Sequence, residues 1–454
     1  MIKRIIIASI LTIITLTGFS QTYISPDNQK IKISGAMFND ISSERIIFYR
    51  HSQTFYALPD NIALTSDAKA KTNTGVALYF ITDAENIKIH FKMLEGKNSY
   101  WLYTLYYIDG DSIETVKLKR DAVAAGDSTF VININSPSAG SHVYQIVLST
   151  FCTYGFYGLT LTGGSESLEN YNLPYRPFYV AYGNSITHGR GQNTGNQTYP
   201  WVLADKMNWE TYNIAVGGAK TSVPMAAMIK NDITKTIDFL TILIGFNDAV
   251  GFAKDTLYYR KKLIAFIDTV RTGHPETTIF VIGQTYTIAT ENSNGEPVNF
   301  DDWRKVQKYV VDSLKAQGDS LIYYLNGADF TNYNDLNNPP NDKVHLSVNG
   351  AYHLGNALAD TILKILCNPN KINYHTSNKE RLKLYPNPAH NFVTLSGFSK
   401  KSKTIEVFNI NGKPVMNKKI NDKRQNITLN LKNFENGIYL IKTECSTVKF
   451  IKNE

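Results

Sequence analysis

Cysteine is scarce in this sequence, and most of it also lacks long hydrophobic runs. The 454 residues include three cysteines, Cys152, Cys367 and Cys445, which lie far apart and are odd in number. They predict neither a disulfide framework nor a cysteine-based metal site. After the first twenty residues, no apolar run approaches the length of a membrane span. With 43% hydrophobic and 19% charged residues, the chain instead predicts a folded protein of two or three domains.

The first twenty residues have a different composition from the rest. Lys3 and Arg4 precede an apolar run from Ile5 to Thr17, which is followed by the exit Gly18-Phe-Ser20. A basic start, a short hydrophobic run and a small-residue exit are typical of a signal peptide, with cleavage before Gln21. The alternative is a retained membrane anchor, for which the run is short. We therefore expect residues 1–20 to direct export and to leave no transmembrane segment in the mature chain.

Positive charge is concentrated at the end of the chain. The formal net charge is +8, and residues 371–454 contain 16 Lys and Arg against 6 Asp and Glu, a net of +10, which leaves −2 for residues 1–370. A basic terminal segment does not identify a partner for the main body. We expect no nucleic-acid partner.

Residues 22–165 predict an N-terminal β-sandwich domain of jelly-roll type. Apolar and polar residues alternate along 87–93 and 130–135, and turn-forming residues separate such runs, with no helical stretch expected between them. An aromatic group at Tyr100, Trp101, Tyr103, Tyr106 and Tyr107 could form a sugar-stacking surface, although such strands more often line a core. Two roles are compatible with this domain, which are to bind substrate or only to pack against its neighbour.

Residues 177–367 predict an α/β domain with a five-stranded parallel sheet. Strand-like runs alternate here with helical stretches, so the sheet should be covered on both faces. The expected strands are 178–182, 211–215, 239–244, 278–282 and 321–325. The expected helices are 199–208, 222–235, 256–272, 301–317 and 349–366.

The loops that follow the first three of these strands contain the candidate catalytic groups. Ligands bind beyond the carboxyl ends of parallel strands, where the strand order switches. Ser185 follows the first strand and is the candidate nucleophile. The backbone N–H groups of Ser185 and Gly218 and the side-chain amide of Asn247 are candidate oxyanion donors.

Two histidines compete for the role of general base. His345 has an acid three residues before it, Asp342, which could orient one ring nitrogen while the other faces Ser185. His188 lies closer to the serine in sequence, but no acid accompanies it, so we interpret it as a structural or pocket-wall residue. Ser347 is expected to cap the last helix of the domain.

Together, four short blocks resemble the signature blocks of the SGNH/GDSL hydrolases. They are 183–187 (GNSIT), 213–218 (NIAVGG), 245–248 (GFND) and 342–345 (DKVH). The resemblance implies a flavodoxin-like fold, with Ser185, Asp342 and His345 as the catalytic triad and Ser185, Gly218 and Asn247 as the oxyanion hole. It implies no metal and no organic cofactor. One residue departs from the family pattern, because Asn184 stands where these enzymes usually have aspartate.

The last part of the chain, residues 380–454, predicts a second small β-sandwich. The motifs Tyr385-Pro-Asn-Pro388 and Gly437-Ile-Tyr439 resemble those of the type A C-terminal sorting domain of type IX secretion. The resemblance implies the type IX secretion machinery as a partner, passage through the periplasm and across the outer membrane, and removal of the tail. Residues 368–379 are expected to form a linker.

The sequence thus predicts a secreted or cell-surface serine esterase. A β-sandwich placed before an SGNH domain is similar to the arrangement in carbohydrate esterases of family 2 and acetylxylan esterases. This resemblance implies an acetylated polysaccharide or oligosaccharide as substrate. The alternatives are a lipase, thioesterase or arylesterase for longer acyl chains, and an inactive cell-surface protein that binds glycans.

Overall fold

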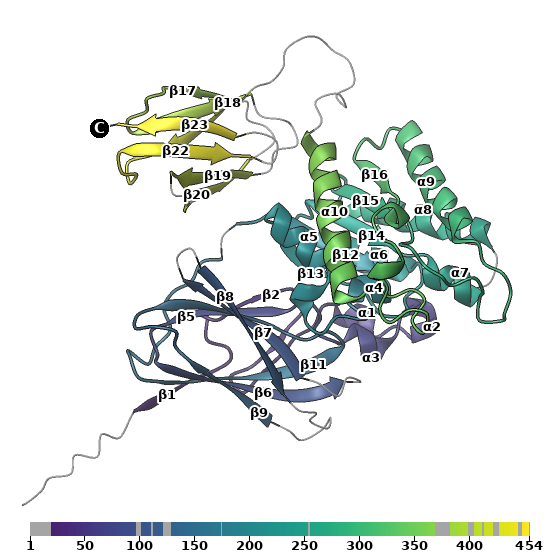
Figure 1. Cartoon of the computed structure of the whole chain (residues 1–454), viewed down its shortest axis with the longest axis horizontal. Helices are drawn as coiled ribbons and strands as arrows, with labels where there is room; N and C mark the ends of the chain where they lie inside the picture. Colours follow the sequence, from purple (N-terminus) through teal and green to yellow (C-terminus); the bar gives the residue numbers. More distant parts are fainter. Residues whose placement is uncertain are drawn as a thin grey trace, which may run out of the picture.

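The computed structural model comprises two β-sandwiches and an α/β layer structure between them in sequence (Figure 1). It describes residues 20–96, 101–109, 112–120, 129–173, 175–252, 255–367, 382–397, 404–410, 413–420, 426–443 and 447–453. For residues 95–130, only the backbone of the strands is described. The predicted signal peptide, except Ser20, the side chains of the aromatic group at 100–107 and the predicted linker 368–379 lie outside the described residues.

The N-terminal part contains two antiparallel sheets that face each other. One has the order β3-β4-β11-β6-β9, with β1 also paired to β11, and the other has the order β2-β5-β10-β7-β8. Leu78 and Phe80 of β5 pack with Ile87 and Ile89 of β6 in one buried core, so alternate residues of the two sheets fill the space between them. The strands are β1 (Gln21–Ile24), β2 (Lys32–Ser34), β3 (Asp40–Ile41), β4 (Ile46–Ile47), β5 (Ala77–Thr82), β6 (Asn86–Gly96), β7 (Trp101–Asp109), β8 (Ser112–Arg120), β9 (Thr129–Asn135), β10 (His142–Val147) and β11 (Cys152–Thr162).

The expectation of no helices in this part is wrong. Three short helices, α1 (Gln53–Tyr56), α2 (Asp60–Ala63) and α3 (Asp67–Ala70), lie between β4 and β5. Each has four residues, so none is long enough to display a helical period in the sequence. They leave the sandwich and pack against the central part, where Phe55, Ala63 and Ala70 join the core beside helix α6 (Val223–Asp232).

The central part is a parallel sheet with the order β13-β12-β14-β15-β16, covered by helices on both faces (Figure 1). Its strands are β12 (Phe178–Gly183), β13 (Glu210–Asn213), β14 (Phe239–Leu243), β15 (Thr278–Ile282) and β16 (Ile322–Leu325). The helices are α4 (Ser185–His188), α5 (Tyr199–Met207), α6, α7 (Phe246–Phe252), α8 (Thr256–Gly273), α9 (Phe300–Ala316) and α10 (Val348–Cys367), with three 3₁₀ turns η1 (Gly195–Gln197), η2 (Gly327–Asp329) and η3 (Tyr333–Asp335).

The two faces of the sheet have separate cores because successive strand residues point to opposite sides. Tyr179 and Ala181 of β12 pack with the α5 and α10 side chains, including Leu354, Leu358 and Ile362. Val180 and Tyr182 pack with α6, α8 and α9. The strand order reverses direction at β12, which places the loops after β12, β13 and β14 side by side.

The C-terminal part has two antiparallel sheets with their own buried core. The sheets have the orders β17-β18-β21 and β20-β19-β22-β23. Their strands are β17 (Lys383–Tyr385), β18 (Phe392–Ser396), β19 (Thr404–Asn409), β20 (Pro414–Lys419), β21 (Asn426–Asn430), β22 (Gly437–Lys442) and β23 (Thr447–Lys452). No described helix anywhere in the chain has the length and apolar character needed to span a bilayer.

Candidate active site

Ser185 is the first residue of α4, directly beyond the end of β12. The turn between them is tight, because a Cβ at Gly183 would lie 2.1 Å from Thr187 Oγ1 and 2.7 Å from the Leu243 carbonyl oxygen. Glycine therefore allows the chain to change from strand to helix within two residues. Asn184 caps the new helix, and its side-chain oxygen accepts a hydrogen bond from Ile186 N–H at 3.0 Å. This turn presents Ser185 at the carboxyl edge of the sheet.

Ser185, His345 and Asp342 form a hydrogen-bonded chain. Ser185 Oγ lies 2.7 Å from His345 Nε2. His345 Nδ1 lies 3.0 Å from each carboxylate oxygen of Asp342. A carboxylate can only accept, so Nδ1 carries the proton and Nε2 presents its lone pair to the serine hydroxyl. The three residues predicted for the triad therefore meet, although 160 positions separate the serine from the histidine.

The pKa values of the histidine and the acid suit this arrangement. Burial lowers the pKa of His345, Asp342 raises it, Arg190 lowers it again, and the net shift is downward. Burial raises the pKa of Asp342, but hydrogen bonds from His345 and Val344 outweigh that effect and the net shift is also downward. At neutral pH the imidazole is therefore neutral and the carboxylate ionised.

Several bonds fix the loop that carries His345. The His345 carbonyl oxygen accepts from Asn337 N–H at 2.8 Å, and Gln192 Nε2 donates to the Leu346 carbonyl oxygen at 2.6 Å. Ser347 caps α10 as predicted, since its Oγ accepts from Gly350 N–H at 3.0 Å. The histidine is thus fixed by the helix that follows it and by residues after α4.

The loops after β13 and β14 carry the two remaining predicted donors. Gly218 has a φ of +87°, a backbone conformation that favours glycine, and a Cβ there would approach only Lys69 Nζ, at 3.6 Å. Asn247 lies in α7, and its side-chain Nδ2 donates to the Ala219 carbonyl oxygen at 2.9 Å. That bond ties Asn247 to the residue that follows Gly218, so the two predicted donors belong to one connected loop pair.

His188 has a structural role and no contact with Ser185 among the described interactions. It is fully buried, its Nδ1 accepts from Gly217 N–H at 2.9 Å, and its Nε2 lies 2.8 Å from Thr72 Oγ1. Since the Thr72 hydroxyl donates to the Lys69 carbonyl oxygen at 2.7 Å, it accepts from His188 Nε2–H. Burial, reinforced by Arg50, His51 and Lys69, holds the pKa of His188 well below its usual value.

A buried arginine from the N-terminal part completes this contact, and no sequence motif predicts it. Arg50 is 0% exposed and its guanidinium donates to the carbonyl oxygens of Thr72, Asn213 and Ala215 at 2.5, 2.5 and 3.0 Å. Burial lowers the pKa of Arg50 to about 10, which leaves it charged at neutral pH. One guanidinium therefore joins the chain after α3 to the loop that leads to Gly218. Its partners are backbone oxygens, which a sequence pattern does not reveal.

No group of three or more described histidine, cysteine or acidic residues could hold a metal ion. The described part of the site consists instead of a serine, a neutral histidine, a carboxylate and N–H donors.

Two family models match the chain. Residues 181–353 match the GDSL-like Lipase/Acylhydrolase family. The matched range includes all four blocks that meet in the site. This model covers the centre of the chain, which we call the acylhydrolase domain after the match. Residues 383–453 match the Secretion system C-terminal sorting domain, which indicates secretion or export to the cell surface. No curated protein matches the chain.

Solved structures with the same fold cover more of the chain than the acylhydrolase domain. A salicylyl-acyltransferase, SsfX3 from a tetracycline biosynthetic pathway, is 18% identical, with a TM-score of 0.65 over 77% of this chain and 98% of its own. A putative GDSL-like lipase from Bacteroides ovatus is 16% identical, with a TM-score of 0.61 over 76% and 98%. A family two carbohydrate esterase from Cellvibrio japonicus is 15% identical, with a TM-score of 0.54 over 76% and 98%. At these identities the likeness concerns the fold, including the N-terminal part.

The side chain of Asn184, directly before the serine, forms a hydrogen bond through its oxygen but none through its nitrogen among the described residues. Asn184 is 1% exposed, and its Nδ2 has no hydrogen-bond partner among the described residues. Its backbone N–H donates to the Leu243 carbonyl oxygen at 3.3 Å. The side chain thus acts through its oxygen as a helix cap, a task that an aspartate could also perform.

Proposed function

We propose that the protein is an exported serine esterase that removes acyl groups, above all acetyl groups, from polysaccharide or oligosaccharide esters. The observation that carries the proposal is the chain of hydrogen bonds from Ser185 through His345 to Asp342. Its geometry supports nucleophilic acyl transfer, for which a serine needs a base in contact and an acid behind that base.

In the proposed reaction, Ser185 Oγ attacks the ester carbonyl carbon while its proton passes to His345 Nε2. The charge that develops on the carbonyl oxygen would be stabilised by the N–H groups of Ser185 and Gly218 and by the Asn247 amide. One Asn247 N–H already binds the Ala219 carbonyl oxygen, and the amide has a second. The protonated histidine then gives its proton to the leaving alcohol oxygen.

Water completes the cycle. It loses a proton to His345 and attacks the acyl-enzyme carbonyl carbon, which releases the carboxylic acid and restores the serine hydroxyl. Asp342 keeps the imidazole in the required tautomer and stabilises its protonated form throughout. In this scheme no step requires a metal or an organic cofactor.

Two findings support a carbohydrate ester as substrate. Family two carbohydrate esterases share the fold over about three quarters of this chain, and a rumen acetyl xylan esterase does so with a TM-score of 0.51 at 13% identity. The sorting domain adds export, which is consistent with an extracellular polysaccharide as substrate.

The test compares the wild type with Ser185→Ala on a short aryl acetate and on acetylated xylan, with acetate release as the measurement. We expect the variant to lose about 10³-fold or more of kcat. Undiminished hydrolysis by Ser185→Ala would contradict the assignment.

An esterase for longer acyl chains would show rising kcat/KM from acetyl to octanoyl, whereas a deacetylase should show a steep fall. An inactive glycan-binding protein would hydrolyse none of these esters in the wild-type form.

A further inference from the structure

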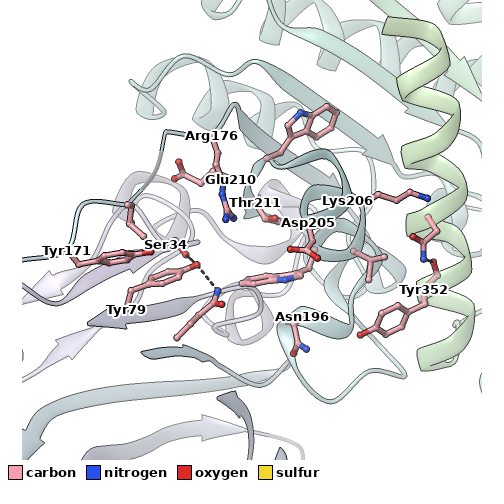
Figure 2. A pocket seen from close by; sticks show the side chains of 16 residues that line it. Ser34, Tyr79, Tyr171, Arg176, Asn196, Asp205, Lys206, Glu210, Thr211 and Tyr352 are labelled. Carbon is pink, nitrogen blue, oxygen red and sulfur yellow. Dashed lines mark hydrogen bonds between the residues drawn. The ribbon is translucent and has the colours of Figure 1, made fainter. Parts of the chain in front are cut away.

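A cavity of about 470 Å³ lies at the junction of the N-terminal sandwich, the connector after it and the acylhydrolase domain. Figure 2 shows side chains from the sheet of β2 and β5, from helix α5 and from helix α10 around it. Its volume is within the range of about 300–1,000 Å³ that ligand sites occupy.

This cavity is separate from the catalytic site. Glu210 and Thr211, at the start of β13, contribute to its lining. Glu210 pairs in register with Phe178 at the start of β12, whereas Ser185 follows the end of that strand. The Glu210 end of the cavity therefore lies at the opposite edge of the sheet from Ser185, roughly 20 Å away along the strands. No residue predicted for the triad or the oxyanion hole lines the cavity.

Aromatic side chains make up one wall of the cavity. Tyr79 and Tyr171 face it with ring centroids 6.3 Å apart and planes inclined by 31°. Trp201 of α5 packs against the same small cluster and also lines the cavity. Ring faces of this kind bind the apolar face of a flat, partly polar ligand.

Polar groups also line this cavity, and Figure 2 labels Arg176, Asp205 and Glu210 among them. Asp205 is exposed on α5, and no hydrogen bond or ion pair of its carboxylate is found among the described residues. The cationic Arg176 lines the same cavity, and its Nε is buried without a partner among the described residues. Two further lining charges, Lys206 and Glu210, are paired with residues outside the cavity. Arg176 has the carboxylate of Glu406 near it, outside the cavity. Asp205 is then the lining charge without a charged partner among the described residues, which favours a neutral ligand rich in hydroxyl groups over an anion.

A third feature indicates unused binding capacity. Trp209 lines the cavity and is 1% exposed, and its indole N–H has no hydrogen-bond partner among the described residues. A buried donor without a partner costs free energy, which a hydroxyl oxygen or a water bridging to a ligand could recover.

We propose that this cavity is a second, non-catalytic binding site for a short stretch of neutral polysaccharide. Rings that stack on sugar faces, together with an acceptor and donors for hydroxyl groups, are the chemistry that a saccharide needs. A second contact with the same polymer would raise the local concentration of ester groups near Ser185. The binding itself does not depend on the proposed esterase activity.

The experiment is isothermal titration of the full-length chain carrying Ser185→Ala with unacetylated xylohexaose, cellohexaose and mannohexaose. We expect saturable binding of at least one of them. Adding Trp201→Ala should weaken that binding about tenfold or more, and adding Asp205→Asn several-fold. Since Asp205 is exposed, its variant should fold normally, which thermal unfolding can check. Tyr309→Ala on the distant helix α9, 54% exposed, is the matched aromatic control and should leave binding unchanged.

Two kinetic measurements separate the cavity from the catalytic site. In the chain with Ser185 intact, Trp201→Ala should leave kcat/KM for a short aryl acetate unchanged and should raise KM for acetylated polysaccharide. The proposal is overturned if none of the three oligosaccharides binds, or if binding persists unchanged in both Trp201→Ala and Asp205→Asn. Failure of Ser185→Ala to abolish hydrolysis would overturn the esterase assignment alone.

Discussion

At the scale of single residues, the charges around His345, the proposed general base, set the pH at which it is neutral. Arg190 is exposed, belongs to the loop after α4 and lowers the pKa of His345. A neutral imidazole is needed to accept the serine proton. In a plot of kcat/KM against pH, activity should therefore fall on the acid side (the acid limb) at a pH below 6.5, which is about the ordinary pKa of histidine.

Arg190→Gln should move this acid limb to higher pH. Removing the cation removes an influence that disfavours the protonated imidazole, so the pKa of His345 rises and activity is lost earlier as pH falls. The measurement is kcat/KM for a short aryl acetate between pH 4 and pH 8, and Arg190→Lys is the control that keeps the charge. Added salt should shift the wild-type limb in the same direction, because an exposed charge is screened. If kcat/KM of Arg190→Gln fell at the same acidic pH as that of the wild type, Arg190 would not influence the pKa of His345.

At the scale of secondary-structure elements, the loop 214–222, which carries the proposed oxyanion donor Gly218 and is called the oxyanion loop below, contacts a histidine outside the proposed triad. His188 is held by Thr72 on one side and holds Gly217 on the other. Gly217 precedes the predicted donor Gly218, so a shift in the imidazole would displace that donor. We interpret Thr72 and His188 as positioning residues.

Thr72→Val should lower kcat for the short aryl ester by about tenfold, with a small change in KM. Valine keeps the shape but cannot accept from His188 Nε2–H, which leaves a buried donor unpaired and frees the ring. Donors that act in the transition state affect kcat more than ground-state binding. Thr72→Ser retains the hydroxyl and should stay near the wild type. Equal kcat in Thr72→Val and Thr72→Ser would contradict the positioning role.

The sequence predicted the elements of the central sheet well, because strands buried on both faces appear as short continuous apolar runs and amphipathic helices show a clear period. The expected run 278–282 coincides with β15, and the expected helix 256–272 ends one residue before α8 does. At the site, the contact between Ser185 and His345 could be expected from the order of the four blocks. Arg50 could not, since it acts on backbone carbonyl oxygens across two domains, and the one-turn helices α1–α3 are too short to show periodicity.

Asp248 should make the stability of the loop pair depend on pH. It is 2% exposed, and both its oxygens accept from Thr221 N–H at 3.1 Å. Burial raises its pKa to about 6, against about 4 in an unfolded chain. The folded state therefore binds more protons between these values, so the free energy of unfolding should fall as pH rises from about 4 to about 6.

Urea unfolding of the wild type and Asp248→Asn at several pH values between 4 and 6.5 measures this effect. The amide cannot ionise, so the variant should lack this part of the pH dependence. Identical slopes of unfolding free energy against pH in both proteins would contradict the raised pKa.

At the scale of the whole molecule, the two β-sandwiches relate differently to the acylhydrolase domain. The N-terminal part contributes Arg50, Thr72 and the side chains of α1–α3 to the central core and the oxyanion loop. The sorting domain has its own core and touches the rest through a few polar contacts, such as Asn417 Nδ2 to the Tyr175 carbonyl oxygen at 2.9 Å. None of its described contacts involves the triad.

Two truncations should therefore give opposite results. A chain without residues 380–454 should hydrolyse a short aryl ester within about twofold of the full-length rate, because it keeps every group at the catalytic site. A chain without residues 22–165 should yield no active enzyme, since the oxyanion loop loses the guanidinium and the hydroxyl that fix it and the core beside α6 becomes exposed. Purified protein from each truncation is assayed for ester hydrolysis and thermal unfolding alongside the full chain. Full activity after the N-terminal deletion would mean that the acylhydrolase domain orders its oxyanion loop unaided, and the contacts of Arg50 would then be reduced to an interface between domains.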